Sequence, residues 1–236
     1  MATTADQILA TLQSRYGTQD FGNYNIRRQS FYDYGRYNNS GVTSQRFFTN
    51  PVGSTDPVSS LSKTLEETNL QTANQLNYNF ILTQIRTHIY LLPKKRQPTS
   101  IATLTRALAN DLGATNLLLA ELALQGVLTV SFGQKLYFDI EQPFKVAPAG
   151  FGVEVTAIPA AAATTAIPLN YLYQTSNRTD DIYNTTPPVL IEKSQTIDVQ
   201  IQFPNGTSTA IATVNGAAPA INLGVIFDGY IIEPVQ

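Results

Sequence analysis

Residues 197–203, with the sequence IDVQIQF, decide the fold class of this chain. The apolar residues at 197, 199, 201 and 203 alternate with Asp198, Gln200 and Gln202. Successive side chains of a strand point to opposite faces, so this pattern predicts a β-strand with one buried and one exposed face. Asn205-Gly206, directly after it, is a turn signal.

The neighbouring sequence continues the strand pattern toward the C-terminus. A short strand is expected at 209–214 and a last strand, or pair of strands, at 221–232 with a kink at Asp228-Gly229. Upstream, residues 126–144 contain two alternating runs on either side of Gly133-Gln134, which predicts two strands joined by a bend.

Residues 78–92, YNFILTQIRTHIYLL, are apolar on both expected faces. One face carries Phe80, Leu82 and Gln84, and the other carries the isoleucines at 81, 85 and 89. A strand of this kind is expected to lie inside a sheet and to be covered on both sides.

Two short helices are expected among the strands. Residues 4–16 have a possible capping box at Thr4 and Gln7, and residues 100–112 have a cap at Ser100. Seven or more strands separated by Gly- and Pro-containing turns nevertheless predict an all-β chain, an antiparallel β-sandwich or barrel, with a helical insertion.

Residues 1–45 are predicted to form a unit of their own, an N-terminal helix followed by an arm, with the β-sandwich domain at 46–236. Residues 18–50 have only weak periodicity and interleave Tyr and Phe with Arg. Such side chains are typical of protein interfaces and of single-stranded nucleic acid surfaces, and we favour subunit contact. The predicted contact residues are Phe31, Tyr32, Tyr34, Arg36 and Tyr37.

The composition is poor in charge and rich in neutral polar groups. Charged residues make up 14% of the chain, against about 25% in an ordinary domain, while Asn, Gln, Ser and Thr account for 75 of 236 residues. Because interface cores are depleted in charge, this composition hints at a subunit covered by its neighbours.

The charge is unevenly distributed between the two halves of the chain. Residues 1–106 contain 11 Lys/Arg and 6 Asp/Glu, a net charge of +5, whereas residues 107–236 contain 4 and 11, a net charge of −7. The two halves could neutralise each other in the fold, or the basic half could face genome or an internal membrane. The residues proposed to do so are Arg27, Arg28, Lys94, Lys95 and Arg96.

The sequence shows no constellation for catalysis. A single His, at 88, and no Cys leave neither a cluster of metal ligands nor an obvious triad. Asp180-Asp181 could bind a hard cation, but no known loop spacing supports it. We therefore expect no enzyme activity, no cofactor and no small-molecule substrate.

The order of segments resembles the jelly-roll capsid proteins of icosahedral, tailless bacteriophages. The resemblance rests on GQKLYFD at 133–139, on the strand at 191–203 and on VIFDG at 225–229, and it covers roughly residues 46–235. It implies a virion shell protein with an N-terminal arm that reaches inward or to neighbours. At 236 residues, a single jelly roll fits better than a double one.

The leading hypothesis is thus a non-enzymatic capsid subunit that is made in the host cytoplasm and assembles with copies of itself and other capsid proteins. The alternative is a β-sandwich module of a phage fibre or vertex that binds a receptor or glycan through Tyr171, Tyr173 and Tyr183. An enzyme on a sandwich scaffold is the third hypothesis, and it lacks a visible pair of catalytic acids.

Overall fold

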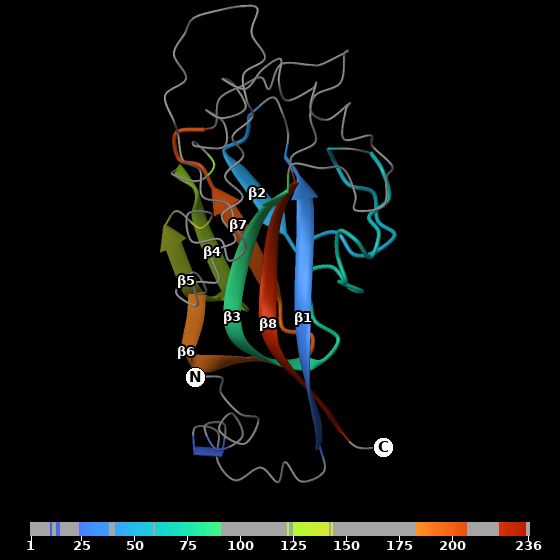
Figure 1. Ribbon diagram of the computed structural model, residues 1–236, viewed down its shortest axis with the longest axis vertical. Coiled ribbons are helices and arrows are strands. Elements are labelled where there is room, and N and C mark those ends of the chain that lie inside the picture. The colour runs from blue at the N-terminus through green and yellow to red at the C-terminus, as the bar shows by residue number, and fades with distance from the viewer. Residues whose placement is uncertain are drawn as a thin grey trace, which may run out of the picture.

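The computed structural model describes residues 24–37, 41–58, 60–90, 126–141, 183–206 and 222–234, with a few single positions besides. These residues form eight β-strands in two sheets (Figure 1). The strands are β1 (Tyr24–Arg36), β2 (Ser44–Phe47), β3 (Asn79–Tyr90), β4 (Val127–Phe132), β5 (Lys135–Glu141), β6 (Tyr183–Ile191), β7 (Ile197–Gln202) and β8 (Asn222–Pro234).

Every strand pairing is antiparallel, and the two sheets have four strands each. The first sheet has the order β1-β8-β3-β6 and the second has the order β2-β7-β4-β5. Among the described strands, β4 and β5 are the only two that follow one another in the chain and lie in the same sheet, and every other pair of successive strands is divided between the two sheets. The predicted all-β sandwich is therefore confirmed.

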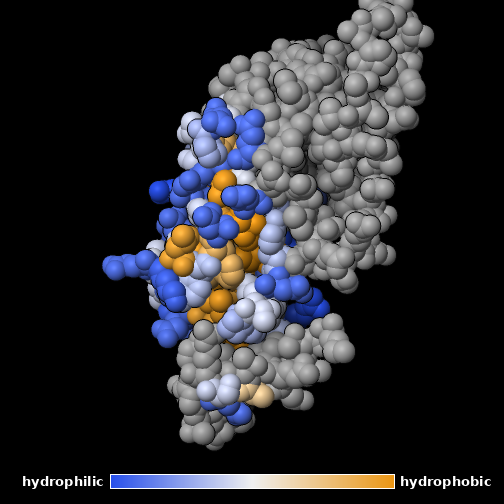
Figure 2. Space-filling model, turned by 90° about the vertical axis from the view of Figure 1, so that its left-hand side faces the viewer, coloured by the Kyte–Doolittle hydropathy of each residue, from blue (hydrophilic) through white to orange (hydrophobic). Residues whose placement is uncertain are grey.

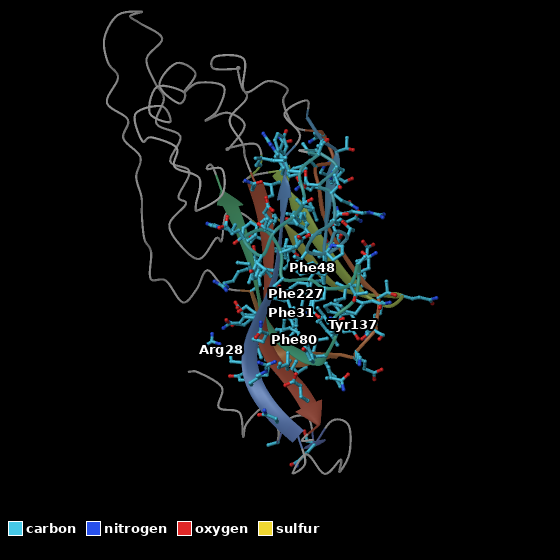
Figure 3. All side chains as sticks on the ribbon, turned by 90° about the vertical axis from the view of Figure 1, so that its right-hand side faces the viewer. Arg28, Phe31, Phe48, Phe80, Tyr137 and Phe227 are labelled. Atoms are coloured by element: carbon cyan, nitrogen blue, oxygen red, sulfur yellow. The ribbon has the colours of Figure 1, made fainter. Side chains whose placement is uncertain are left out.

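The core lies between the sheets, where aromatic rings from several elements meet. The Phe227 ring of β8 stacks on Phe48 with 4.8 Å between centroids, and Phe31 of β1 meets Phe80 of β3 edge-on at 5.0 Å. Figure 3 shows these four rings one below another in the middle of the sandwich, with Arg28 on its outer side. In β7 the residues at 197, 199 and 201 are buried, as their alternation predicts.

The hairpin predicted around Gly133-Gln134 is confirmed as β4 and β5, and Gly133 has the positive φ of 62° that favours glycine in a turn. The alternation of the second strand predicts that Leu136 lies on the buried face, but its side chain is 55% exposed. A register shift between Val130 and Ser131 separates it from the regular part of the pairing.

Strand β3 is central, as predicted, but its faces differ from the expected ones. A register shift between Leu82 and Gln84 moves Ile85 to the core side with Phe80 and Leu82. Gly229 of β8 lies opposite this irregularity, where an added Cβ would come within 1.9 Å of the Ile81 carbonyl oxygen. Of the two expectations, a single strand or a pair, the single strand is correct, because β8 continues through residues 228–229 without a break.

The turn at Asn205-Gly206 is confirmed, since Gly206 N donates to Phe203 O at 2.8 Å and has a φ of 69°. The partners of β7 among the described strands are β2 and β4. The strand expected at 209–214 and the helix at 100–112 lie outside the described residues, and so does almost all of the helix expected at 4–16.

The prediction of a separate arm is wrong for residues 24–37. Strand β1 pairs with β8 along its whole length, from Tyr24 with Pro234 to Arg36 with Asn222. Phe31 and Tyr37 are 7% and 1% exposed in the core. The domain boundary at residue 45 therefore cuts through the sandwich, and deleting residues 1–45 would test folding rather than assembly.

Candidate subunit interface

The two sides of the sandwich, where the sheet edges lie, are built differently. At one side the edge strands are β1 and β2, and at the other they are β6 and β5. We call the first the hairpin flank, because the connection from β2 to β3 folds over it, and the second the edge flank.

Residues 52–65 of that connection form a hydrogen-bonded hairpin on the hairpin flank, here called the flank hairpin. Gly53 N donates to Lys63 O and Lys63 N to Ser54 O, both at 2.8 Å, and Asp56 N donates to Leu61 O at 2.8 Å. The side chain of Asp56 accepts a bond from Val58 N at 3.0 Å within the turn. The composition of residues 50–62, rich in Pro, Gly and Ser, predicts only a loop and gives no sign of this pairing.

The residues after the flank hairpin cover the backbone edge of β1. Tyr34 N donates to Glu67 O at 2.7 Å, and Asn69 accepts from Tyr32 N at 2.9 Å through its side chain. The Asn69 amide donates in turn to Ser30 O at 2.7 Å. An uncovered edge strand has unpaired N–H and C=O groups that can pair with a strand of another chain. Because residues 67–69 bind these groups of β1, this edge is unsuited to further strand pairing.

A buried ion pair attaches the flank hairpin to β1. Lys63 Nζ lies 2.6 Å from Asp33 Oδ1, and the two side chains are only 3% and 1% exposed. Asp33 Oδ2 also accepts a hydrogen bond from Phe48 N at 2.7 Å. Burial raises the pKa of Asp33 above its ordinary value, and the charge of Lys63 acts in the opposite direction.

The outward surface of the flank hairpin is neutral and partly apolar. None of the described exposed residues between 52 and 65 is charged, because Asp56 and Lys63 are turned inward. The exposed fractions of Val52, Val58, Leu61 and Leu65 are 40%, 42%, 55% and 66%. Depletion of charge together with exposed large apolar groups is typical of protein contact surfaces.

The edge flank also exposes apolar side chains, on β5 and β6. Leu136 is 55% exposed, and partly buried Phe138, Ile140 and Val189 pack against the core from these edge strands. Figure 2, which faces this side, shows hydrophobic residues reaching the surface among hydrophilic ones.

The outer face of the first sheet carries a cluster of polar side chains that could not be predicted from the sequence. Arg86 of β3 binds both carboxylate oxygens of Asp228 on β8, with Nη2 to Oδ1 at 2.8 Å. Ser30 of β1 donates to Asp228 Oδ1 at 2.5 Å. The residues are up to 198 positions apart in sequence, so only the strand order brings them together.

The predicted contact residues fall into two groups. Phe31 and Tyr37 are core residues, so they are not available to another subunit. Tyr32, Tyr34 and Arg36 alternate with them and are half-buried on the outer face.

Both tyrosines of the outer face have partners within the chain. The Tyr34 ring lies over Gly224, where an added Cβ would come within 2.3 Å of it, and its hydroxyl lies 3.4 Å from Nδ1 of His88. The Tyr32 hydroxyl donates to Leu65 O. Their contact with another subunit remains a prediction.

The predicted basic residues are described only in part. Arg27 pairs with Glu233 at 3.4 Å on the surface, and Arg28 is exposed beside it. Lys94, Lys95 and Arg96 lie outside the described residues, as does the Asp180-Asp181 pair. Contact of the basic residues with genome or lipid stays a prediction.

Of the tyrosines predicted to stack on a glycan, Tyr183 alone lies within the described residues. It is half-buried in β6 and packs against the core, and burial raises its pKa to about 12. Its hydroxyl is buried and makes no hydrogen bond among the described residues. This placement does not suit a surface that stacks on sugar rings.

Replacing Tyr183 by phenylalanine is expected to leave the protein equally stable or to stabilise it by up to about 1 kcal/mol, because an unsatisfied buried hydroxyl is removed. Urea unfolding of the unassembled chain would measure the change. A loss of stability would show that the hydroxyl has a partner after all.

The described residues contain no group of three or more metal-ligating side chains, and none of their helices could cross a membrane. Comparison of the chain with models of protein families, with curated proteins and with solved structures found no match.

Proposed function

We propose that the chain is a structural virion protein, a single jelly-roll subunit that assembles with copies of itself into an icosahedral shell. The support for a jelly roll is the strand order. The described residues form eight antiparallel strands in two four-stranded sheets, and all pairs of successive described strands but one are divided between the sheets, as in the double Greek-key arrangement of that fold.

Jelly rolls occur in capsid proteins, lectins and metal-binding cupins, so the fold alone does not decide between these functions. The observation that carries the assembly proposal is the neutral surface of the flank hairpin. Its two charged residues, Asp56 and Lys63, are held inside while Leu61 and Leu65 face outward. A surface that combines exposed leucines with no exposed charge is typical of a contact surface, and this supports a subunit covered by a neighbour.

The proposal is tested by the behaviour of the purified full-length chain. Sedimentation velocity over a range of concentrations is expected to show a large assembly, and negative-stain microscopy is expected to show closed particles. A small oligomer of fixed size that binds glycans would favour the fibre or vertex module, and a monomer at every concentration would contradict assembly.

A further inference from the structure

The sandwich has four edge strands, β1 and β6 in the first sheet and β2 and β5 in the second, with β1 on one side of the molecule and β5 and β6 on the other (Figure 1). We propose that all four edges are closed to strand pairing, so that copies of this chain meet through side chains and do not share a sheet. The inference goes beyond the proposed function, because it applies to a monomer as well as to a shell.

An edge strand is a hazard for any β-sandwich. Its outward N–H and C=O groups have no partner within the sheet, so a strand of another chain can pair with them and start aggregation. Natural sheets hinder this pairing with a covering segment, a very short strand, a bulge, a proline or exposed charges. The four edges of this chain show all of these features between them.

The edges at the hairpin flank are covered or short. Residues 67–69 bind backbone groups of β1 between Ser30 and Tyr34, and the part of the strand before this cover exposes the charges of Arg27 and Arg28. Strand β2 has only four residues, all of which pair with β7. Neither strand therefore offers a second chain a long, neutral row of backbone groups.

Strand β5 contains a bulge. Leu136 and Phe138 pair with successive residues of β4, so Tyr137 between them has no place in the register. A bulge of this kind bends the strand and interrupts the regular row of backbone groups. A second strand could therefore pair with only one half of β5 at a time.

Exposed charges add to the effect of the bulge. Lys135, Asp139 and Glu141 make up three of the seven residues of β5, and all three are exposed. Both carboxylates lie on the outer face of the sheet, so those of a second β5 would lie close to them, and like charges opposite each other are destabilising. Lys135 does not relieve this repulsion, because it pairs with Phe132 on the inner face.

Strand β6 is interrupted by two prolines. Its paired residues are 183–184 and 189–191, and the four residues between them fall opposite a single residue of β3, Thr83. Pro187 and Pro188 are two of these four, and proline has no N–H group to donate. The outward edge of β6 therefore consists of two short segments in place of one continuous row.

Strand β5 gives the most direct test in the full-length chain. Asp139→Thr with Glu141→Thr replaces two exposed carboxylates by a residue type that favours strands. The matched control is Asp198→Thr with Glu192→Thr, which changes the net charge equally. Its two positions are also exposed, but they lie in the central strand β7 and in the turn before it.

Pro187→Thr with Pro188→Thr tests the edge of β6 separately. Circular dichroism and cooperative urea unfolding would verify that each variant is folded. If the β6 variant does not fold, the β5 variant still decides whether its own edge is closed by charge.

The readout is the formation of intermolecular β-sheet, followed by thioflavin T fluorescence and by infrared spectroscopy during incubation of the folded chains. The wild-type chain is expected to give neither signal, even under conditions in which it forms particles. The β5 variant is expected to give both signals about tenfold faster than its control, and the β6 variant faster than the wild type.

The other outcomes overturn the inference in recognisable ways. Wild-type assemblies with both signals would show that copies share strands. If one variant aggregates no faster than its reference, the closure proposed for that edge is wrong, and if neither does, the inference fails as a whole. A wild-type chain that stays monomeric without either signal would contradict the proposed shell but support the closed edges.

Discussion

Replacing Lys63 by methionine is expected to destabilise the protein by about 3–5 kcal/mol, because it leaves the Asp33 carboxylate buried without its partner. The two side chains are 3% and 1% exposed, so water cannot take the place of the ammonium group. Methionine fills a similar volume, which limits the effect to the loss of charge. Urea unfolding of the unassembled chain at neutral pH would measure the change.

The same variant should become more stable relative to the wild type when the pH is lowered. Burial raises the pKa of Asp33 above its ordinary 3.8 and Lys63 lowers it, so removing Lys63 raises the pKa further. An acid with a higher pKa in the folded chain gains stability as the pH falls through that pKa, because the folded state binds the proton more tightly. The difference from the wild type should therefore shrink between neutral pH and the ordinary carboxyl value.

The double variant Lys63→Met with Asp33→Asn is the control for this interpretation. A neutral amide can still accept the hydrogen bond that Phe48 N gives to the carboxylate. We expect most of the lost stability to return, since a buried ion pair replaced by neutral groups is often close to neutral in energy. A double variant as unstable as the single one, or a loss independent of pH, would refute the role of the charge.

This ion pair also explains why the sequence did not reveal β1. The inward face of the strand carries Asp33 and Gly35 between two aromatic residues, which breaks the alternation that identifies a half-buried strand. Asp33 is tolerated there because Lys63, 30 positions later, neutralises it. An added Cβ on Gly35 would come within 2.4 Å of the Gln45 side chain. Neither fact is visible in the local sequence.

Strands β4 and β7 could be predicted most directly, because their inward residues are all apolar. Strand β7 alternates without exception, and β4 buries Leu128, Val130 and Phe132. The candidate interface could not be predicted, because the sequence does not show which side chains of the flank hairpin are exposed and which are buried. Composition marks residues 50–62 as a loop, but only the fold shows that the charged residues of the flank hairpin point inward and its leucines point outward.

Replacing Phe227 by alanine is expected to cost about 3–5 kcal/mol of stability, the usual cost of a large cavity at a buried aromatic site. The Phe227 side chain is fully buried, stacks on Phe48 and meets Phe132 of the second sheet at 6.1 Å between centroids. Phe227 therefore links the first sheet, to which it belongs, with the second sheet through Phe132. It also contacts Phe48, which precedes the flank hairpin in the chain. Urea unfolding of the unassembled chain is the measurement.

Phe227→Leu provides the matched comparison, because leucine fills much of the ring's volume and should cost about 1–2 kcal/mol. Phe48 N also donates to Asp33, so a loosened Phe48 should weaken the attachment of the flank hairpin to β1. In Phe227→Ala, amide exchange at Gly53 and Lys63 should then accelerate more than exchange within β7. Equal acceleration at both places would mean that the cavity destabilises the sandwich as a whole and leaves the flank hairpin no looser than the rest.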